Sequence, residues 1–108
     1  MQLTDEQLDA IIAWAKRTPE VAVVILYGSR YRGTAEPTDD VDLALVMTKE
    51  GFSERERALN YFHNFDTWQA DLHSALGLPV RLVSFDPALG SEVRSYVAKG
   101  NTELWRRA

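Results

Sequence analysis

The sequence predicts a mixed α/β (α+β) fold in which helices flank a small mixed sheet. Two observations support this prediction. Apolar segments rich in β-branched residues, which are typical of buried strands, occur at residues 21–27, 41–47 and 80–85. Segments with the apolar spacing of amphipathic helices lie before and between them. Strands and helices therefore alternate along the chain, as they do in proteins whose helices cover a sheet.

The first helix is expected between Thr4 and Pro19. Thr4 and Gln7 have the spacing of a capping box, and Pro19 ends the helix. Its apolar face consists of Leu8, Ile11, Ile12 and Ala15. A continuous apolar strand follows at 21–27, and a loop with glycine and proline is expected at 28–39, before the strand at 41–47.

The second half of the chain contains one long helix, a strand and a shorter helix. The long helix covers 53–76 and carries an apolar stripe of Phe62, Phe65, Trp68, Leu72 and Leu76. The third strand is expected at 80–85, and a helix capped by Ser91 at 91–99. Leu104 and Trp105 are expected to pack back on the core.

The composition indicates an ordinary globular chain, and we expect a single domain over residues 1–108. Of its residues, 45% are apolar and 26% charged, and there is no cysteine for disulfides or a Cys-ligated zinc. No apolar run approaches the roughly 20 residues of a membrane span, and the acidic, amphipathic N-terminal segment is unlike a signal peptide. We therefore expect a cytoplasmic protein without a membrane partner. The net charge of −4 is no strong sign of nucleic-acid binding.

Two aspartates mark the start of the second strand. Asp40 and Asp42 are one residue apart, so on a strand both side chains point to the same face. Two carboxylates on one face repel unless a cation lies between them, and oxygen ligands suit a hard divalent ion such as Mg²⁺. The spacing of an EF-hand calcium loop is absent. The pair therefore predicts a metal site, with a solvated turn as the simpler alternative.

The turn after the first strand has the residues of a phosphate site. Gly28 permits close approach of the backbone to a ligand, and Ser29 offers a hydroxyl and a backbone N–H. Arg30 and Arg32 are permanent cations suited to phosphate, although solvated loop charges explain them equally well. Together with the acidic pair, this turn favours phosphoryl or nucleotidyl transfer.

These residues resemble the DNA polymerase beta-like nucleotidyltransferase superfamily, in particular its minimal nucleotidyltransferase (MNT) domains. The resemblance rests on Gly28-Ser29, Gly33 and the motif Asp40-Val41-Asp42-Leu43, and the order of elements extends it over nearly the whole chain. It implies a nucleotidyltransferase fold in which Asp40 and Asp42 are catalytic and bind Mg²⁺. It further implies that Gly28, Ser29 and the arginines bind a nucleoside triphosphate, with ATP as the first expectation and Arg30 slightly favoured over Arg32.

The resemblance also implies a reaction and a partner. A nucleoside monophosphate, AMP in the first instance, would pass to a hydroxyl on a protein, RNA or small molecule. The short chain leads us to expect that another chain delivers the acceptor. Small members of this family act as antitoxins of a helical HEPN-type toxin, so a toxin–antitoxin pair is implied. Homo-oligomerisation is left open.

One position departs from the family pattern. The third carboxylate usually comes from a later strand, but Arg81 stands at that place here, and Asp86 lies five residues further on. On a regular strand an odd separation puts Asp86 on the opposite face. We therefore expect Arg81 on the site face, where it can bind phosphate. The arginine at this position leaves open an alternative function, a catalytically weak or inactive MNT-like module that neutralises a toxin by binding. Sugar-nucleotide enzymes also use a D-x-D motif, but their catalytic domains need a far longer chain, so we discount that class.

Overall fold

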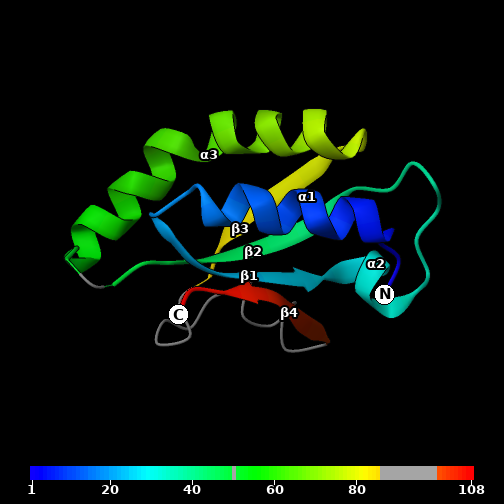
Figure 1. Ribbon diagram of the computed structural model, residues 1–108, viewed down its shortest axis with the longest axis horizontal. Coiled ribbons are helices and arrows are strands. Elements are labelled where there is room, and N and C mark those ends of the chain that lie inside the picture. Colours follow the sequence, from blue (N-terminus) through cyan, green and yellow to red (C-terminus); the bar gives the residue numbers. More distant parts are fainter. Residues whose placement is uncertain (50, 86–99) are drawn as a thin grey trace.

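A computed structural model describes residues 1–49, 51–85 and 100–108 as a mixed sheet flanked by helices (Figure 1). Its elements are α1 (Asp5–Lys16), β1 (Val21–Tyr27), α2 (Gly28–Arg32), β2 (Val41–Met47), α3 (Glu54–Leu76), β3 (Val80–Ser84) and β4 (Asn101–Arg106). The strand order is β3-β2-β1-β4. β2 and β3 are parallel, whereas β1 is antiparallel to both β2 and β4. The predicted α/β class with a small mixed sheet is confirmed.

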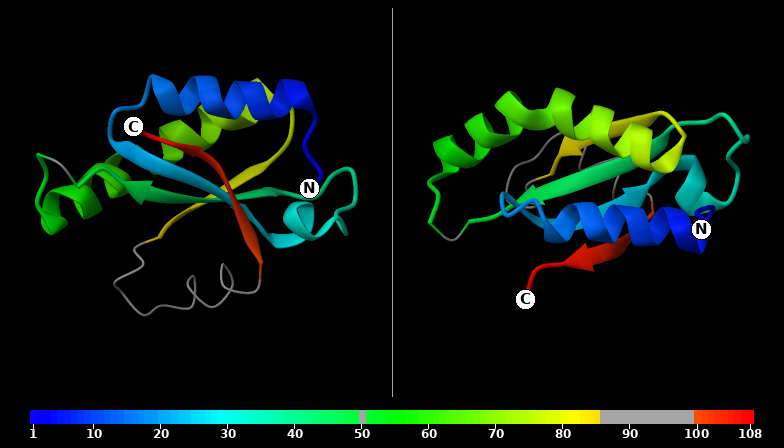
Figure 2. Two further views of the ribbon diagram at one scale, coloured as in Figure 1. Left: turned by 60° about the horizontal axis from the view of Figure 1, so that its bottom comes forward. Right: turned by 45° about the horizontal axis from the view of Figure 1, so that its top comes forward.

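Both long helices lie on one face of the sheet (Figure 2). α1 begins at the predicted capping box of Thr4 and Gln7, and α3 begins at a second one formed by Ser53 and Glu56. Trp14 and Trp68 join the two helices edge to face, with ring centroids 5.9 Å apart. The main core forms between these helices and the sheet residues that point toward them.

The alternation of β2 decides where the polar side chains point. Val41, Leu43 and Leu45 belong to the core under the helices, and Ala44 belongs to a smaller cluster on the other face. Asp42 has the same parity as Ala44, so its side chain lies on the face turned away from α1 and α3. A site built around Asp42 therefore does not disturb the main core.

The structure corrects two of the predicted elements. The expected loop at 28–39 begins with the short helix α2, and the C-terminal segment forms β4, a strand that the sequence pattern did not predict. Leu104 and Trp105 do pack against the core, as expected, but they do so from β4. The predicted helix at 91–99 lies outside the described residues. In the described part of the chain, no helix is long and apolar enough to span a membrane.

Candidate functional site

The ends of three neighbouring strands bring the predicted site residues together. In the sheet, Asp42 of β2 pairs with Tyr27 of β1 on one side and with Arg81 of β3 on the other. A pocket of about 290 Å³ opens there, lined by Tyr27, Gly28, Ser29, Arg32, Asp42 and Arg81. We call it the Asp42 pocket. Arg81 therefore lies on the same face as Asp42, as its position in the sequence predicts.

Gly28 forms the junction between β1 and α2. Its φ of +77° lies in the left-handed region, which side chains with a Cβ adopt only with strain. A Cβ at this position would clash with Oδ2 of Asp42. The glycine thus lets the backbone pass directly beside this carboxylate and brings Ser29 into the same pocket.

Substituting Gly28 with alanine should disrupt the site as well as strain the backbone. Gly33 is a matched control, because its φ is +78° but a Cβ there would meet nothing within 4 Å. We expect Gly33→Ala to cost about 1–2 kcal/mol of stability. Gly28→Ala should cost more and displace the Asp42 carboxylate. Urea unfolding of both variants measures the difference, and equal losses would contradict the clash.

The Asp42 carboxylate is in an unfavourable environment for its charge. Burial is the largest cause that raises its pKa, and Asp40 raises it further, whereas Arg81 and Arg32 act in the opposite direction. Among the described residues, no hydrogen bond or ion pair engages the carboxylate of Asp40 or Asp42. Two free carboxylates that repel each other fit a divalent cation, which accepts hard oxygen ligands.

The described part of the chain supplies few metal ligands beyond this pair. Within residues 1–49, 51–85 and 100–108 no group of three or more His, Cys, Asp or Glu side chains has the geometry of a metal site. A cation held by Asp40 and Asp42 would therefore complete its coordination with water or with oxygens of a bound phosphate, as Mg²⁺ commonly does. Asp86 lies outside the described residues.

Tyr27 also lines the Asp42 pocket, although its place at the end of the apolar run at 21–27 predicts a packing residue. Its side chain is buried, and burial, followed by the charge of Asp42, raises the pKa of its phenol to about 12. Tyr27 therefore remains a neutral hydrogen-bonding group at physiological pH. Its place as the residue directly before Gly28, opposite Asp42, is the signal that could have identified it.

Arg30 does not lie where the phosphate-binding prediction needs it. Its side chain is only 6% exposed, and its guanidinium donates hydrogen bonds to the carbonyls of Gln2, Pro37 and Asp39 at 3.0–3.3 Å. Two residues on a helix are about 200° apart, so α2 directs Arg30 inward and leaves Arg32 at the pocket. The expectation that Arg30 binds phosphate in preference to Arg32 is corrected. Arg30 instead stabilises the loop that leads to Asp40 by hydrogen bonds to its carbonyls.

Replacing Arg30 with methionine should therefore destabilise the protein. The change removes the donor of these partly buried hydrogen bonds, and we expect a loss of roughly 2–4 kcal/mol, since hydrogen bonds to a charged group contribute about 1.5–3 kcal/mol each. Arg32→Met is the control, because Arg32 is exposed and should cost little. Urea unfolding tests this pair. Equal stability of both variants would contradict a structural role for Arg30.

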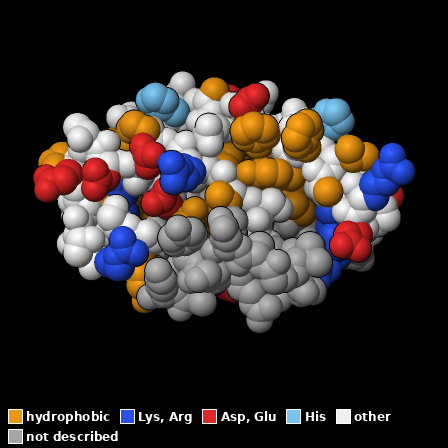
Figure 3. Space-filling view, turned by 180° about the vertical axis from the view of Figure 1, so that it is seen from behind, with side chains coloured by type: hydrophobic (Ala, Val, Ile, Leu, Met, Phe, Trp, Pro, Cys, Tyr) orange, Lys and Arg blue, Asp and Glu red, His pale blue; other side chains and the backbone are white. Residues whose placement is uncertain are grey.

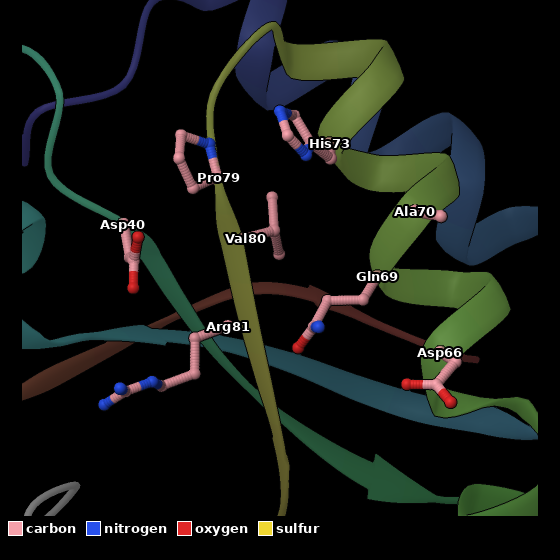
Figure 4. Close-up of a pocket in the computed structure, with 8 residues that line it drawn as sticks. All are labelled: Asp40, Asp66, Gln69, Ala70, His73, Pro79, Val80 and Arg81. Carbon is pink, nitrogen blue, oxygen red and sulfur yellow. The ribbon is translucent and has the colours of Figure 1, made fainter.

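A second cavity, of about 430 Å³, lies between α3 and the start of β3 (Figure 4). We call it the α3–β3 cavity. Asp40, directly before β2, and Arg81 of β3 line it from the side of the sheet, and Arg81 thus borders both cavities. Asp66, Gln69, Ala70 and His73 line it from α3. His63 and His73 lie ten residues apart on the predicted helix, which does not suit a metal pair, so the sequence predicts a surface or boundary position for His73. The helical spacing of the four residues from α3 is the signal that could have identified the cavity.

Comparisons with known proteins agree with this architecture. Residues 9–108 match the family model described as polymerase beta, nucleotidyltransferase. No curated protein matches the sequence. Among solved structures, a toxin–antitoxin with AMP-PNP has a TM-score of 0.66 at 22% identity and covers 93% of this chain and 73% of its own.

Two further structures show the same fold. A mutant of the toxin–antitoxin MntA-HpeT has a TM-score of 0.66 at 21% identity, covering 98% of this chain and 75% of its own. The tri-AMPylated Shewanella oneidensis HEPN toxin in complex with MNT antitoxin has a TM-score of 0.59 at 20% identity, covering 94% and 71%. At these identities the likeness concerns the fold. Because the family model spans nearly the entire sequence, the chain belongs to the polymerase beta nucleotidyltransferase family.

Proposed function

We propose that this protein is a single-domain, Mg²⁺-dependent nucleotidyltransferase that transfers AMP from ATP to a hydroxyl group of a partner protein in the cytoplasm. The observation that carries the proposal is the Asp42 pocket. It combines a carboxylate that makes no hydrogen bond or ion pair among the described residues, a glycine-serine turn that leaves no room for a Cβ beside that carboxylate, and two arginines. These are the groups needed to hold a metal and a polyphosphate together.

Each group has a defined role in this proposal. Asp40 and Asp42 would hold Mg²⁺, which when bound neutralises charge on the triphosphate oxygens. Ser29 and the adjacent backbone N–H groups bind phosphate oxygens, and Arg32 stabilises charge on the leaving group. The acceptor oxygen forms a bond to the α-phosphorus, the bond from that phosphorus to the bridging oxygen breaks, and pyrophosphate leaves. The hydroxyl proton passes to solvent.

A helical HEPN-type toxin is the proposed partner. Two observations support this part of the proposal. The structures with this fold include toxin–antitoxin complexes, one of them with an AMPylated HEPN toxin. In addition, α3 exposes apolar side chains, with Leu59 43% and Phe62 71% exposed, and hydrophobic side chains gather on the face shown in Figure 3. Such a surface is typical of a protein interface.

Arg81 favours one alternative function. Arg81 is the register partner of Asp42 in the β2–β3 ladder. Its guanidinium cannot serve as a metal ligand, and its charge opposes a second cation. The alternative is a binding module that keeps the fold and the nucleotide but neutralises its partner by forming a complex, with little transfer.

Co-expression with the product of the neighbouring gene tests the function. We expect a stable complex by size-exclusion chromatography and labelled AMP on the partner after incubation with ATP and Mg²⁺. A complex without any AMP transfer would favour the binding module. A monomer that neither binds its neighbour nor labels it would contradict both versions.

A further inference from the structure

The α3–β3 cavity continues the Asp42 pocket on the far side of Arg81. Arg81 lines both spaces, and Asp40 borders the α3–β3 cavity while its charge acts on Asp42. A group bound in the α3–β3 cavity would thus lie beside the same two site residues that border the proposed nucleotide site. Its volume of about 430 Å³ falls within the roughly 300–1,000 Å³ of ligand pockets.

The α3 wall of this cavity is a polar stripe. Asp66, Gln69 and His73 follow one another at helical spacing, and Figure 4 shows their side chains directed from α3 toward β3. Ala70 lies among them and leaves space. The stripe supplies a carboxylate, an amide and an imidazole, which can position a polar ligand by hydrogen bonds.

The edge of β3 gives the cavity its second recognition element. In the parallel ladder, Val41 N–H donates to the carbonyl of Pro79, so the backbone groups of Val80 and Leu82 point away from β2. At Leu82 this edge is already occupied, because its N–H donates to Gln69 Oε1 and its carbonyl accepts from the Tyr61 hydroxyl.

Val80 differs from Leu82 in its hydrogen bonding. Its side chain belongs to the main core and the residue is only 7% exposed, but it lines the cavity, and within the described residues its outward N–H and carbonyl make no hydrogen bond. An extended peptide can therefore pair with the edge at Val80 but cannot continue past Leu82. Edge strands accept extended peptides in this way, with main-chain bonds for affinity and adjoining pockets for side-chain selection.

From this arrangement we propose that the α3–β3 cavity binds the acceptor, a short extended peptide segment of the partner protein. The segment pairs with Val80, and its hydroxyl side chain occupies the cavity and reaches the Asp42 pocket past Arg81. This inference rests on the proposed function and names its acceptor site. The carboxylates of Asp40 and Asp66 repel phosphates, so the cavity favours a peptide over an RNA strand.

Filling the cavity tests the proposal with the full-length chain. Ala70→Trp places an indole among the lining residues, and Ala75→Trp is the matched control. Ala75 is also exposed on α3 but lies about 140° around the helix from Ala70. The probes are N-acetyl-serine N-methylamide, N-acetyl-tyrosine N-methylamide and a single-stranded RNA oligonucleotide, titrated into ¹⁵N-labelled protein. Affinity for ATP with Mg²⁺ is measured in parallel.

We expect the blocked amino acids to shift the amide signals of Asp66, Gln69, His73 and Val80 in the native chain and in Ala75→Trp. Ala70→Trp should weaken these shifts at least tenfold and leave ATP affinity within twofold. Shifts located elsewhere, shifts insensitive to Ala70→Trp, or shifts produced only by the RNA would overturn the proposal. If the native chain does not bind ATP with Mg²⁺ but still shows the shifts caused by the blocked amino acids, the result contradicts the proposed function and not the peptide site.

Discussion

Replacing Asp42 with asparagine is expected to abolish metal-dependent ATP binding and to stabilise the ligand-free protein. Burial raises the pKa of Asp42 above its usual value of about 3.9, so the folded chain binds this proton more tightly than the unfolded chain. Stability is therefore lost as the pH rises through the raised pKa. Asparagine has no charge to desolvate, so the free energy of unfolding at pH 7 should increase by roughly 0.5–2 kcal/mol.

The matched control is Asp39→Asn. Asp39 is a neighbouring acid whose carboxylate accepts a hydrogen bond from the Glu36 N–H, a role that an amide oxygen can keep. We expect this variant to bind ATP with Mg²⁺ like the native chain. Calorimetric titration measures binding, and urea unfolding at pH 4 and pH 7 measures stability. Native-like binding by Asp42→Asn would contradict the assigned site.

The second large effect is expected from Arg81→Asp. The register places residue 81 beside Asp42 on the parallel strand, so an aspartate there adds the third carboxylate that a second metal ion needs. Lost acid–base help alone commonly costs about 10²–10⁴ in rate. We therefore expect the substitution to increase AMP transfer by a similar factor, and to raise the number of bound Mn²⁺ ions per chain from one to two.

Arg81→Met separates the loss of the guanidinium from the gain of a carboxylate, the two changes that Arg81→Asp makes together. Methionine removes the guanidinium but supplies no oxygen ligand, so the metal count should stay at one and transfer should rise little. Transfer to the partner and Mn²⁺ binding are measured for all three chains. If the native chain is already fast and Arg81→Asp destroys its activity, Arg81 takes part in the reaction and does not impair it.

The strands of the fold can be predicted from the sequence where burial on both faces requires a continuous apolar run. β1 and β2 have the expected bounds because both are continuous apolar runs in the middle of the sheet. β4 was missed because, in the sheet of the described residues, it lies at the edge beside β1 and carries an exposed Glu103–Arg106 ion pair, so its sequence is mostly polar. α2 was missed because its five residues are too short to show helical periodicity.

The site follows the same logic. The period of two along a strand predicts that Asp42 and Arg81 share a face, because strand geometry alone decides it. The role of Arg30 was not predictable, since its acceptors are carbonyls whose positions depend on the path of the N-terminal segment and of the loop at 33–39. The α3–β3 cavity arises only when α3 packs beside β3, a contact that no local pattern encodes.

The most direct test of the central claim is a crystal structure of the native chain with Mn²⁺ and a non-hydrolysable ATP analogue. The anomalous signal of Mn²⁺ should lie between the carboxylates of Asp40 and Asp42. The triphosphate should contact Ser29 and Arg32 in the Asp42 pocket. A triphosphate bound elsewhere, or one bound in this pocket without any metal at the two aspartates, would contradict the assignment of this site.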